Sequence, residues 1–328
     1  MILLQSLRAA AASFAAVCVS SAALAAPFDN VFIFGDSLVD SGNIAIATGG
    51  AVPSPSLGYF QGRFNDGPSV GDWLTFYTTG TQLAAPSLAG GNNYSFGNAR
   101  IVANADTVPD LQLQVGAFAL DSKPADGDDL FVINMGGNDV FALVSGDIGG
   151  LSADDYIASA ATIVADSIVQ LELLGAQNLL LMGVPDVGAP PASTAGGTSA
   201  EARAFSETLQ QAILDELAMR SFSLDLRLFD WISFSDTLLS APDAFGLPPL
   251  ESFNLLEPCI GFSGEFGAPD VDCSGFASFD TVHPTSPVNE AFALAALEET
   301  FGVRIAEPAS LALLGFGLLA GAHLRRRP

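Results

Sequence analysis

The chain is poor in basic residues. Its 328 residues include 11 Lys and Arg against 36 Asp and Glu, which gives a formal net charge of -25 at pH 7. Nucleic-acid phosphates and anionic membranes both need compensating cations, so this charge argues against either as a partner. The single lysine, Lys123, follows Ser122 and precedes Pro124, which excludes a Gly-x-x-x-x-Gly-Lys-Ser/Thr phosphate loop.

Histidine and cysteine are also scarce. The two histidines, His283 and His323, are too few for a multi-histidine zinc centre, and we expect neither a metal nor a cofactor. Hydrophobic residues, in contrast, make up 49% of the chain. A chain of this length and composition is not disordered and can bury one or two hydrophobic cores.

Residues 1–26 are predicted to be a secretory signal peptide. Arg8 precedes an apolar run that ends in Ala-Leu-Ala at 23–25, and we expect cleavage near Ala25 or Ala26. Cleavage there would also remove Cys18. The alternative reading is an N-terminal membrane anchor, which the short, Ala-rich run favours less.

Residues 305–328 form a second targeting segment. Ala306-Glu307-Pro308 precedes an apolar stretch at 309–324 and three arginines. Sixteen residues span about 24 Å as a helix, short of a hydrocarbon core of about 30 Å, which predicts a thin or transient span. The arginines would stay on the cytoplasmic side and leave residues 26–306 outside.

This tail resembles the PEP-CTERM sorting signals of Gram-negative bacteria, with Ala306 in place of the first proline of the motif. The resemblance implies that a sortase-like membrane protease cuts near the motif. The protein would then be held transiently at the membrane before it is secreted or reaches the cell surface or extracellular matrix. The alternative is a permanent C-terminal anchor.

The exported part retains two cysteines, Cys259 and Cys273. An oxidising compartment favours a disulfide between them. The bridge would close a loop of 15 residues, for which chain entropy predicts about 3 kcal/mol of stabilisation. Two unpaired thiols are the alternative.

Residues 27–304 are predicted to be one α/β domain. Apolar runs of strand length occur at 30–34, 130–134, 179–183 and 224–229. Helical patterns occur at 69–77, 111–120, 153–174, 200–222 and 287–301, and Ser286 is the expected N-cap of the last. This alternation predicts a mainly parallel sheet between two helical layers. Gly- and Pro-rich stretches at 49–58, 188–197 and 241–249 are predicted to be long loops.

Polar motifs follow two of these strands and precede the last helix. Gly-Asp-Ser-Leu at 35–38 follows the first strand, Gly-Gly-Asn-Asp at 136–139 follows the second, and Asp-Thr-Val-His stands at 280–283. In isolation each could be a turn or a helix cap. In this order they resemble the Gly-Asp-Ser-Leu, Gly-x-Asn-Asp and Asp-x-x-His blocks of the GDSL, or SGNH, hydrolases, and they cover the chain from about residue 30 to 301.

Two further stretches resemble the same family. Residues 93–99 resemble its Asn-aromatic-Ala-x-Gly-Gly-Ala block, from which Ser95 and Asn98 depart. Gly-Arg-Phe-Asn-Asp-Gly at 62–67 resembles the Gly-Arg-Phe-Ser-Asn-Gly stretch of the lipase-like, plant-type branch. Arg63 within it has two readings, as a contact to substrate or as half of a structural salt bridge.

The resemblance implies a three-layer α/β/α, flavodoxin-like fold and a Ser-His-Asp triad. Ser37 would be the nucleophile, His283 the base that activates it, and Asp280 the acid that fixes the imidazole tautomer. Elimination supports His283, since His323 lies in the predicted membrane segment. The Ser37 N–H, the Gly97 N–H and the Asn138 side-chain amide would form the oxyanion hole. No Gly-x-Ser-x-Gly elbow is present, which argues against the α/β-hydrolase fold.

We therefore expect a secreted serine esterase or lipase that hydrolyses a small-molecule or glycan-borne carboxylic ester through an acyl-enzyme. Two alternative functions remain open for this sequence. One is an acyltransferase or deacetylase acting on exopolysaccharide, and the other is a non-enzymatic surface or matrix protein. Neither the acyl chain length nor the oligomeric state follows from the sequence.

Overall fold

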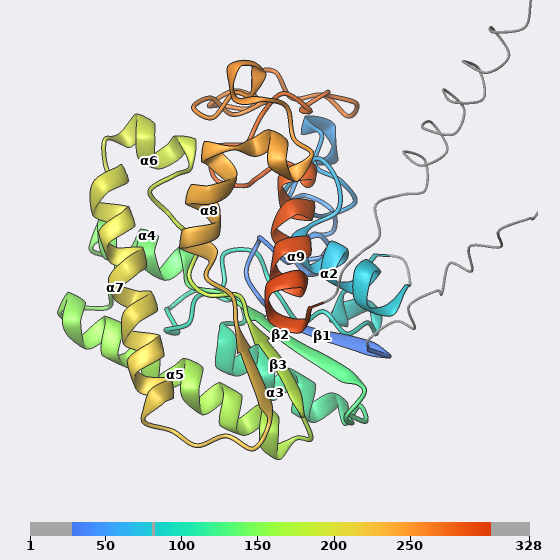
Figure 1. Ribbon diagram of the computed structural model, residues 1–328, viewed down its shortest axis with the longest axis vertical. Helices are drawn as coiled ribbons and strands as arrows, with labels where there is room; N and C mark the ends of the chain where they lie inside the picture. The colour runs from blue at the N-terminus through green and yellow to red at the C-terminus, as the bar shows by residue number, and fades with distance from the viewer. Residues whose placement is uncertain (1–27, 81–82, 303–328) are drawn as a thin grey trace, which may run out of the picture.

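The computed structural model describes residues 28–80 and 83–302. The predicted signal peptide at 1–26 and the predicted sorting signal at 305–328 lie outside these residues. A four-stranded parallel sheet forms the centre, in the order β1 (Asn30–Gly35), β2 (Asp129–Asn134), β3 (Asn178–Leu181) and β4 (Asp225–Leu228) (Figure 1). All four strands coincide with the apolar runs that predicted them.

A fifth segment, residues 92–96, extends the sheet beside β1. The Ile33 N–H donates to the Asn92 carbonyl at 3.0 Å, and the Tyr94 N–H donates to the Ile33 carbonyl at 2.7 Å, in a parallel bridge. If this segment is counted as the second strand, the order becomes 2-1-3-4-5, which is the flavodoxin-like order. The order reverses at β1, so the crevice for a ligand is expected at the carboxyl ends of β1 and β2.

Two layers of helices cover the sheet because β1 and β2 are apolar on both faces. Phe32 and Phe34 face one core, whereas Val31 and Ile33 face the other, as the two-residue period of a strand requires. The first core contains residues of α3 (Leu111–Asp121), α4 (Gly137–Ser145), α5 (Ala153–Leu173) and α7 (Ser199–Ala218). The second contains residues of α2 (Val70–Thr79), α8 (Trp231–Ser240) and α9 (Ser286–Phe301). The predicted three-layer α/β/α fold is confirmed.

The five predicted helices are present, and the structure adds others. The sequence did not predict α4 and α8 or the short helices α1 (Asn43–Ala47) and α6 (Pro191–Gly196). The stretch 188–197, predicted as a loop, therefore contains α6. The N-cap of α9 is Thr285 rather than Ser286, whose N–H instead donates to Asp66 Oδ1 at 2.7 Å.

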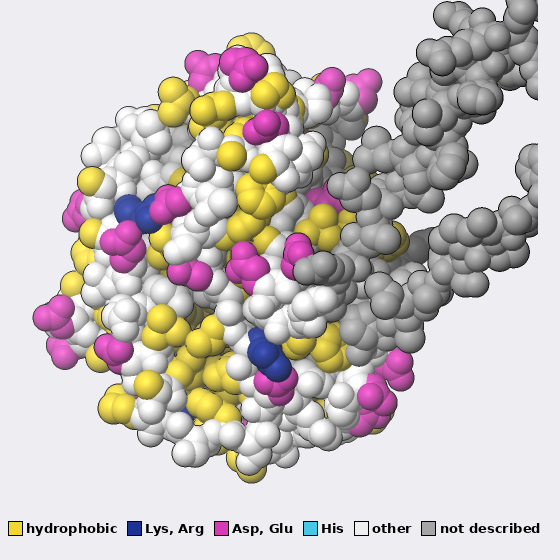
Figure 2. Space-filling view, viewed as in Figure 1, with side chains coloured by type: hydrophobic (Ala, Val, Ile, Leu, Met, Phe, Trp, Pro, Cys, Tyr) yellow, Lys and Arg dark blue, Asp and Glu magenta, His cyan; other side chains and the backbone are white. Residues whose placement is uncertain are grey.

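Acidic side chains are scattered over the face shown in Figure 2, and basic ones are few. Several of the arginines are already paired. Arg203, for example, contacts Asp186, Glu207 and Asp236 at 2.7–2.8 Å. The surface therefore offers little positive charge to an anionic partner.

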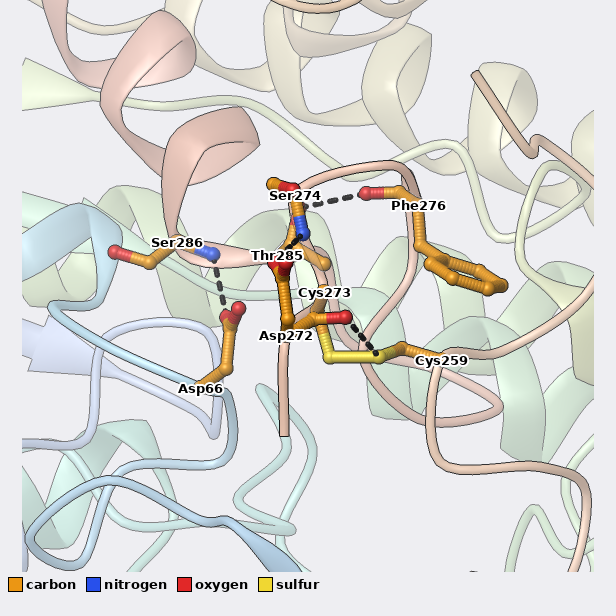
Figure 3. The surroundings of a disulfide bond; sticks show 8 residues. All are labelled: Asp66, Cys259, Asp272, Cys273, Ser274, Phe276, Thr285 and Ser286. Atoms are coloured by element: carbon orange, nitrogen blue, oxygen red, sulfur yellow. Dashed lines mark hydrogen bonds between the residues drawn. A yellow bond between two sulfur atoms is a disulfide. The ribbon is translucent and has the colours of Figure 1, made fainter. Parts of the chain in front are cut away.

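A loop region between α8 and α9 carries a disulfide between Cys259 and Cys273, at the top of Figure 1 and in close-up in Figure 3. Around the disulfide, Ile260 and Phe279 complete a small separate core. The Cys259 N–H donates to the Ser278 carbonyl at 3.0 Å, and the Ile260 N–H donates to the Phe279 carbonyl at 3.1 Å. The disulfide-bonded loop is thus hydrogen-bonded to the segment that leads directly into Asp280.

Candidate active site

The predicted site residues come from three places in the chain and meet at one edge of the sheet. Ser37 follows β1, Asn138 lies in the first turn of α4 just after β2, and Asp280 and His283 stand shortly before α9. Parallel strands end at the same edge, so the first two are close by construction. The start of α9 is bound to the loop before α2, because the Ser286 hydroxyl donates to the Pro68 carbonyl at 2.9 Å.

Ser37, His283 and Asp280 form a continuous hydrogen-bonded chain. His283 Nε2 lies 2.7 Å from Ser37 Oγ. On the other side of the ring, His283 Nδ1 lies 2.8 Å from Asp280 Oδ2 and 2.9 Å from Oδ1. A proton on Nδ1 therefore faces the carboxylate and leaves Nε2 free to accept from the serine hydroxyl.

The Asp280 carboxylate accepts further hydrogen bonds that fix it. The N–H groups of Val282 and His283 each donate to Oδ1 at 2.8 Å, and the Tyr59 hydroxyl donates to Oδ2 at 2.8 Å. The sequence did not identify Tyr59, which lies 221 residues away in an irregular segment. Its ring packs edge-on against Phe279, with centroids 5.0 Å apart.

These contacts shift the ionisation of the pair. Burial raises the pKa of the Asp280 carboxyl, but the charge of His283 and the hydrogen bonds it receives outweigh burial and leave the pKa below its usual range. Burial lowers the pKa of the His283 imidazole, but the charge and hydrogen bond of Asp280 and the charge of Asp36 outweigh this effect and raise the pKa. The pair thus favours an ionised aspartate and a basic imidazole.

Two of the three predicted oxyanion donors have free N–H groups. Within residues 28–80 and 83–302, the Ser37 backbone N–H donates to no other group. Asn138 Nδ2 donates one hydrogen to the Ala99 carbonyl at 2.9 Å, and its second hydrogen remains available. Both residues line the same cavity.

The structure corrects the prediction for Gly97. Its N–H donates to Asp40 Oδ2 at 2.9 Å, and the same carboxylate accepts from the N–H groups of Gly42 and Asn43. This buried carboxylate therefore already uses the Gly97 donor. The adjacent Asn98 N–H has no acceptor in the described part of the chain, and Asn98 has the left-handed φ of 71° that a glycine adopts readily.

Position 97 requires glycine for a different reason, which is steric. A Cβ at this position would overlap the ring of Phe64. That ring packs against the His283 imidazole, with centroids 5.3 Å apart. Gly97 therefore makes room for the aromatic ring that lies on the histidine.

Other polar residues of the motifs hold the loops in place. Arg63 is buried and donates to both oxygens of Asp72 at 2.8 and 3.0 Å, so the salt-bridge reading holds for this residue. Asp139 accepts from the Ile101 N–H at 2.8 Å and from the Tyr156 hydroxyl at 2.9 Å. These contacts join the loops that contain Arg63 and Ile101 to α2, α4 and α5.

Asp36 differs from these residues because it lines the cavity beside Ser37. Its Oδ1 accepts the Leu38 N–H at 3.0 Å. Burial raises the pKa of the Asp36 carboxyl to about 7, against the lowering effects of that hydrogen bond and of His283. Asp36 therefore titrates near neutral pH next to the reacting groups.

A cavity of about 100 Å³ opens beside Ser37 and Asn138. Most of its lining is apolar and comes from the loop after β3, from α8 and from α9. Trp231, Leu238 and Phe292 are among the lining residues, and all three are buried. The site thus combines a hydroxyl that is hydrogen-bonded to an imidazole, N–H groups without an acceptor among the described residues, and an apolar pocket.

The sequence is similar to a known protein family and to several characterised proteins. The sequence profile of the GDSL-like Lipase/Acylhydrolase family matches residues 31–296. The phosphatidylcholine-sterol acyltransferase of Aeromonas hydrophila is 25% identical over 237 residues, which cover 72% of this chain and 68% of that protein. Lipase 1 of Photorhabdus luminescens is 30% identical over 177 residues, which cover 54% of this chain and only 25% of that protein.

Among solved structures, an acetylxylan esterase from Geobacillus stearothermophilus is 12% identical, with a TM-score of 0.42 over 87% of this chain and 100% of that one. Phospholipase A1 from Streptomyces albidoflavus NA297 is 15% identical, with a TM-score of 0.37 over 83% of this chain and 99% of that one.

Proposed function

Because the chain belongs to the GDSL-like lipase/acylhydrolase family, we propose that it is an exported carboxylic ester hydrolase that forms an acyl-enzyme on Ser37. The observation that carries this proposal is the chain of hydrogen bonds from Ser37 through His283 to Asp280. The Gly-Arg-Phe-Asn-Asp-Gly stretch at 62–67 supports placing the protein in the lipase-like, plant-type branch.

In the first step, His283 Nε2 takes the proton of the Ser37 hydroxyl as the oxygen attacks the ester carbonyl carbon. The N–H groups of Ser37 and Asn138 stabilise the oxyanion that forms. The intermediate then collapses, the carbon–oxygen bond to the alcohol breaks, and His283 returns the proton to the alcohol. Asp280 stays ionised throughout and stabilises the imidazolium.

In the second step, water attacks the acyl-enzyme while His283 Nε2 takes one of its protons. Collapse of the second intermediate breaks the bond to Ser37 Oγ, and His283 returns the proton to the serine. The products are a carboxylic acid and an alcohol. No metal or cofactor enters this scheme.

Substitution of the two reacting residues tests the proposal. Ser37→Ala and His283→Ala should each lower hydrolysis of a p-nitrophenyl ester to background, with an unchanged far-UV circular dichroism spectrum. Ser221→Ala, at an exposed serine, is the matched control and should retain full activity. Full activity in the Ser37 or His283 variant would refute the assignment. Failure of a fluorophosphonate to label Ser37 would favour a non-enzymatic surface or matrix protein instead.

Acyl transfer is the second candidate function, and the similarity to an acyltransferase favours considering it. The triad would act in the same way, but an alcohol, such as a sterol or a polysaccharide hydroxyl, would replace water in the second step. Measuring the products formed with and without an added alcohol separates the two activities. Acylated alcohol as the main product would assign the protein as a transferase, and free acid would assign it as a hydrolase or deacetylase.

Export is part of the proposal. The signal-like sequence at 1–26 and the Cys259–Cys273 disulfide support an oxidising compartment outside the cytoplasm. We propose that a sortase-like membrane protease removes the tail near Ala306–Pro308 and releases the protein to the cell surface or extracellular matrix. Mass spectrometry of the exported protein tests this, since a form that retains residues 309–328 would indicate a permanent anchor.

A further inference from the structure

The cavity beside Ser37 distinguishes between kinds of ester. Resting on the hydrolase function proposed above, we infer that it binds the acyl chain of the substrate and favours linear chains of about four or five carbons. The substrate class is therefore an ester of a short aliphatic acid that is longer than acetate, whatever its alcohol.

The first step is that the cavity has few free polar groups for a polar acyl group. Asp186 lines it, but its Oδ2 accepts from Arg203 at 2.8 Å and its Oδ1 accepts the Gly188 N–H at 2.9 Å. The Ser235 hydroxyl also lines it and donates to the Trp231 carbonyl at 2.9 Å. A hydroxyl group on the acyl chain, buried here, would lose its hydrogen bonds to water without full replacement, whereas a hydrocarbon chain would lose nothing.

The second step is that the cavity lies on the acyl side of the ester. The alcohol oxygen must approach His283 Nε2, which protonates it. The cavity lining includes Ser37 and Asn138 but not His283. A group that extends from the carbonyl carbon into this space is therefore the acyl chain, and the alcohol leaves toward the imidazole.

The third step is that rigid aromatic and aliphatic packing limits the depth of the cavity. The rings of Trp231 and Phe292 are stacked with centroids 4.1 Å apart, and Leu238 is fully buried beside them on α8. A cavity of 150 Å³ holds one benzene molecule, and a water-sized group takes about 30 Å³. A volume of about 100 Å³ therefore accepts about three or four methylene-sized groups beyond the carbonyl carbon.

A chain-length profile with pocket-filling variants tests this inference. On p-nitrophenyl esters from acetate to dodecanoate, kcat/KM should rise by about fourfold for each methylene added until the cavity is filled, and then stop rising. Leu239 and Leu255 line the cavity and are only half-buried, so Trp can replace either with less disturbance than at a core position. Leu239→Trp and Leu255→Trp should lower kcat/KM for hexanoate at least tenfold more than for acetate.

The control is Leu173→Trp on α5, where the side chain is 82% exposed, and its profile should match that of the unmodified protein. A flat profile in the unmodified protein, or equal losses on acetate and hexanoate in both pocket variants, would overturn the inference. Faster turnover of acetylated xylan than of any aliphatic ester would also overturn it. In all these cases the Ser37→Ala result still decides the hydrolase function separately.

Discussion

Removal of one hydroxyl at Tyr59 tests how the site is held together. The Tyr59 hydroxyl donates to Asp280 Oδ2 at 2.8 Å, and its ring packs on Phe279 and Phe64. Tyr59→Phe keeps the ring and removes only the donor. The carboxylate would retain the imidazole and the N–H groups of Val282 and His283 on Oδ1, but Oδ2 would lose the donor that fixes its orientation.

The expected loss follows from the strength of the hydrogen bond. A hydrogen bond to a charged group contributes about 1.5–3 kcal/mol. If about half of this holds the carboxylate in the orientation that the transition state needs, kcat should fall about four- to tenfold. KM should stay within about twofold, because Tyr59 would act through Asp280 rather than on the substrate.

The pH profile should move as well. Without the Tyr59 donor, more negative charge on Asp280 faces the imidazole, which raises the pKa of His283 further. Since catalysis needs neutral His283, the acid limb of kcat should shift to higher pH. The assay is hydrolysis of p-nitrophenyl butyrate between pH 5 and 9.

Tyr77→Phe is the matched control, because the Tyr77 hydroxyl donates to the Glu290 carboxylate away from the site. It should leave both kcat and the acid limb unchanged. A Tyr59→Phe variant with the original kcat and the original acid limb would refute a positioning role for Tyr59. Equal losses of kcat in Tyr59→Phe and Tyr77→Phe would show that the loss comes from lower overall stability and not from the contact with Asp280.

Three other changes give distinct outcomes. Asp36→Asn should remove a pH dependence of stability. Between pH 3.8 and the raised pKa of about 7, the folded state holds a proton that the unfolded state has released, so the stability of the unmodified protein falls as pH rises. Calorimetry should therefore show a Tm that varies less between pH 5 and 8 in the variant than in the unmodified protein. Replacing Cys259 and Cys273 together by Ser should cost about 3 kcal/mol and lower Tm by about 6 °C or more, so an unchanged Tm would contradict the argument. Gly97→Ala should lower kcat by about a hundredfold, because the new methyl group displaces the Phe64 ring that packs on His283. The control is Gly116→Ala on α3, where the new methyl group meets open space, and it should leave kcat unchanged.

The strands β1, β2 and β3 could be predicted because both of their faces are buried, whereas β4 is mostly exposed. Phe32 and Ile33, for example, point into different cores, so the whole run is apolar and stands out in the sequence. The helix α8 could not be found in the same way. It is rich in Ser and Thr, which have weak helix propensity, and packing of Trp231 and Phe234 in the core stabilises it. One local signal was present, since the Asp230 side chain caps the helix by accepting the Ser233 N–H.

The residues of the site also fall into two groups, those that the local sequence predicts and those that only the folded chain brings together. Ser37 and Asn138 directly follow strands, and Asp280 and His283 are three residues apart, so local sequence places each of them. Tyr59 reaches Asp280 only because separate loops meet in the folded chain. No spacing in the sequence encodes such a contact, and the same holds for the cavity.

Position 97 shows that a sequence motif does not fix the partner of a backbone N–H. Resemblance identifies a loop that supplies a backbone N–H, but the direction of each N–H depends on the local φ and ψ. Here Asp40 accepts the Gly97 N–H, and Asn98, with its left-handed φ of 71°, leaves its own N–H without an acceptor in the described part of the chain. Asparagine is one of the few non-glycine residues that enter this region readily. Asn98 thus adopts a conformation that glycine also adopts readily, and because the Asp40 carboxylate accepts the Gly97 N–H, the Asn98 N–H is the one of the two without an acceptor among the described residues.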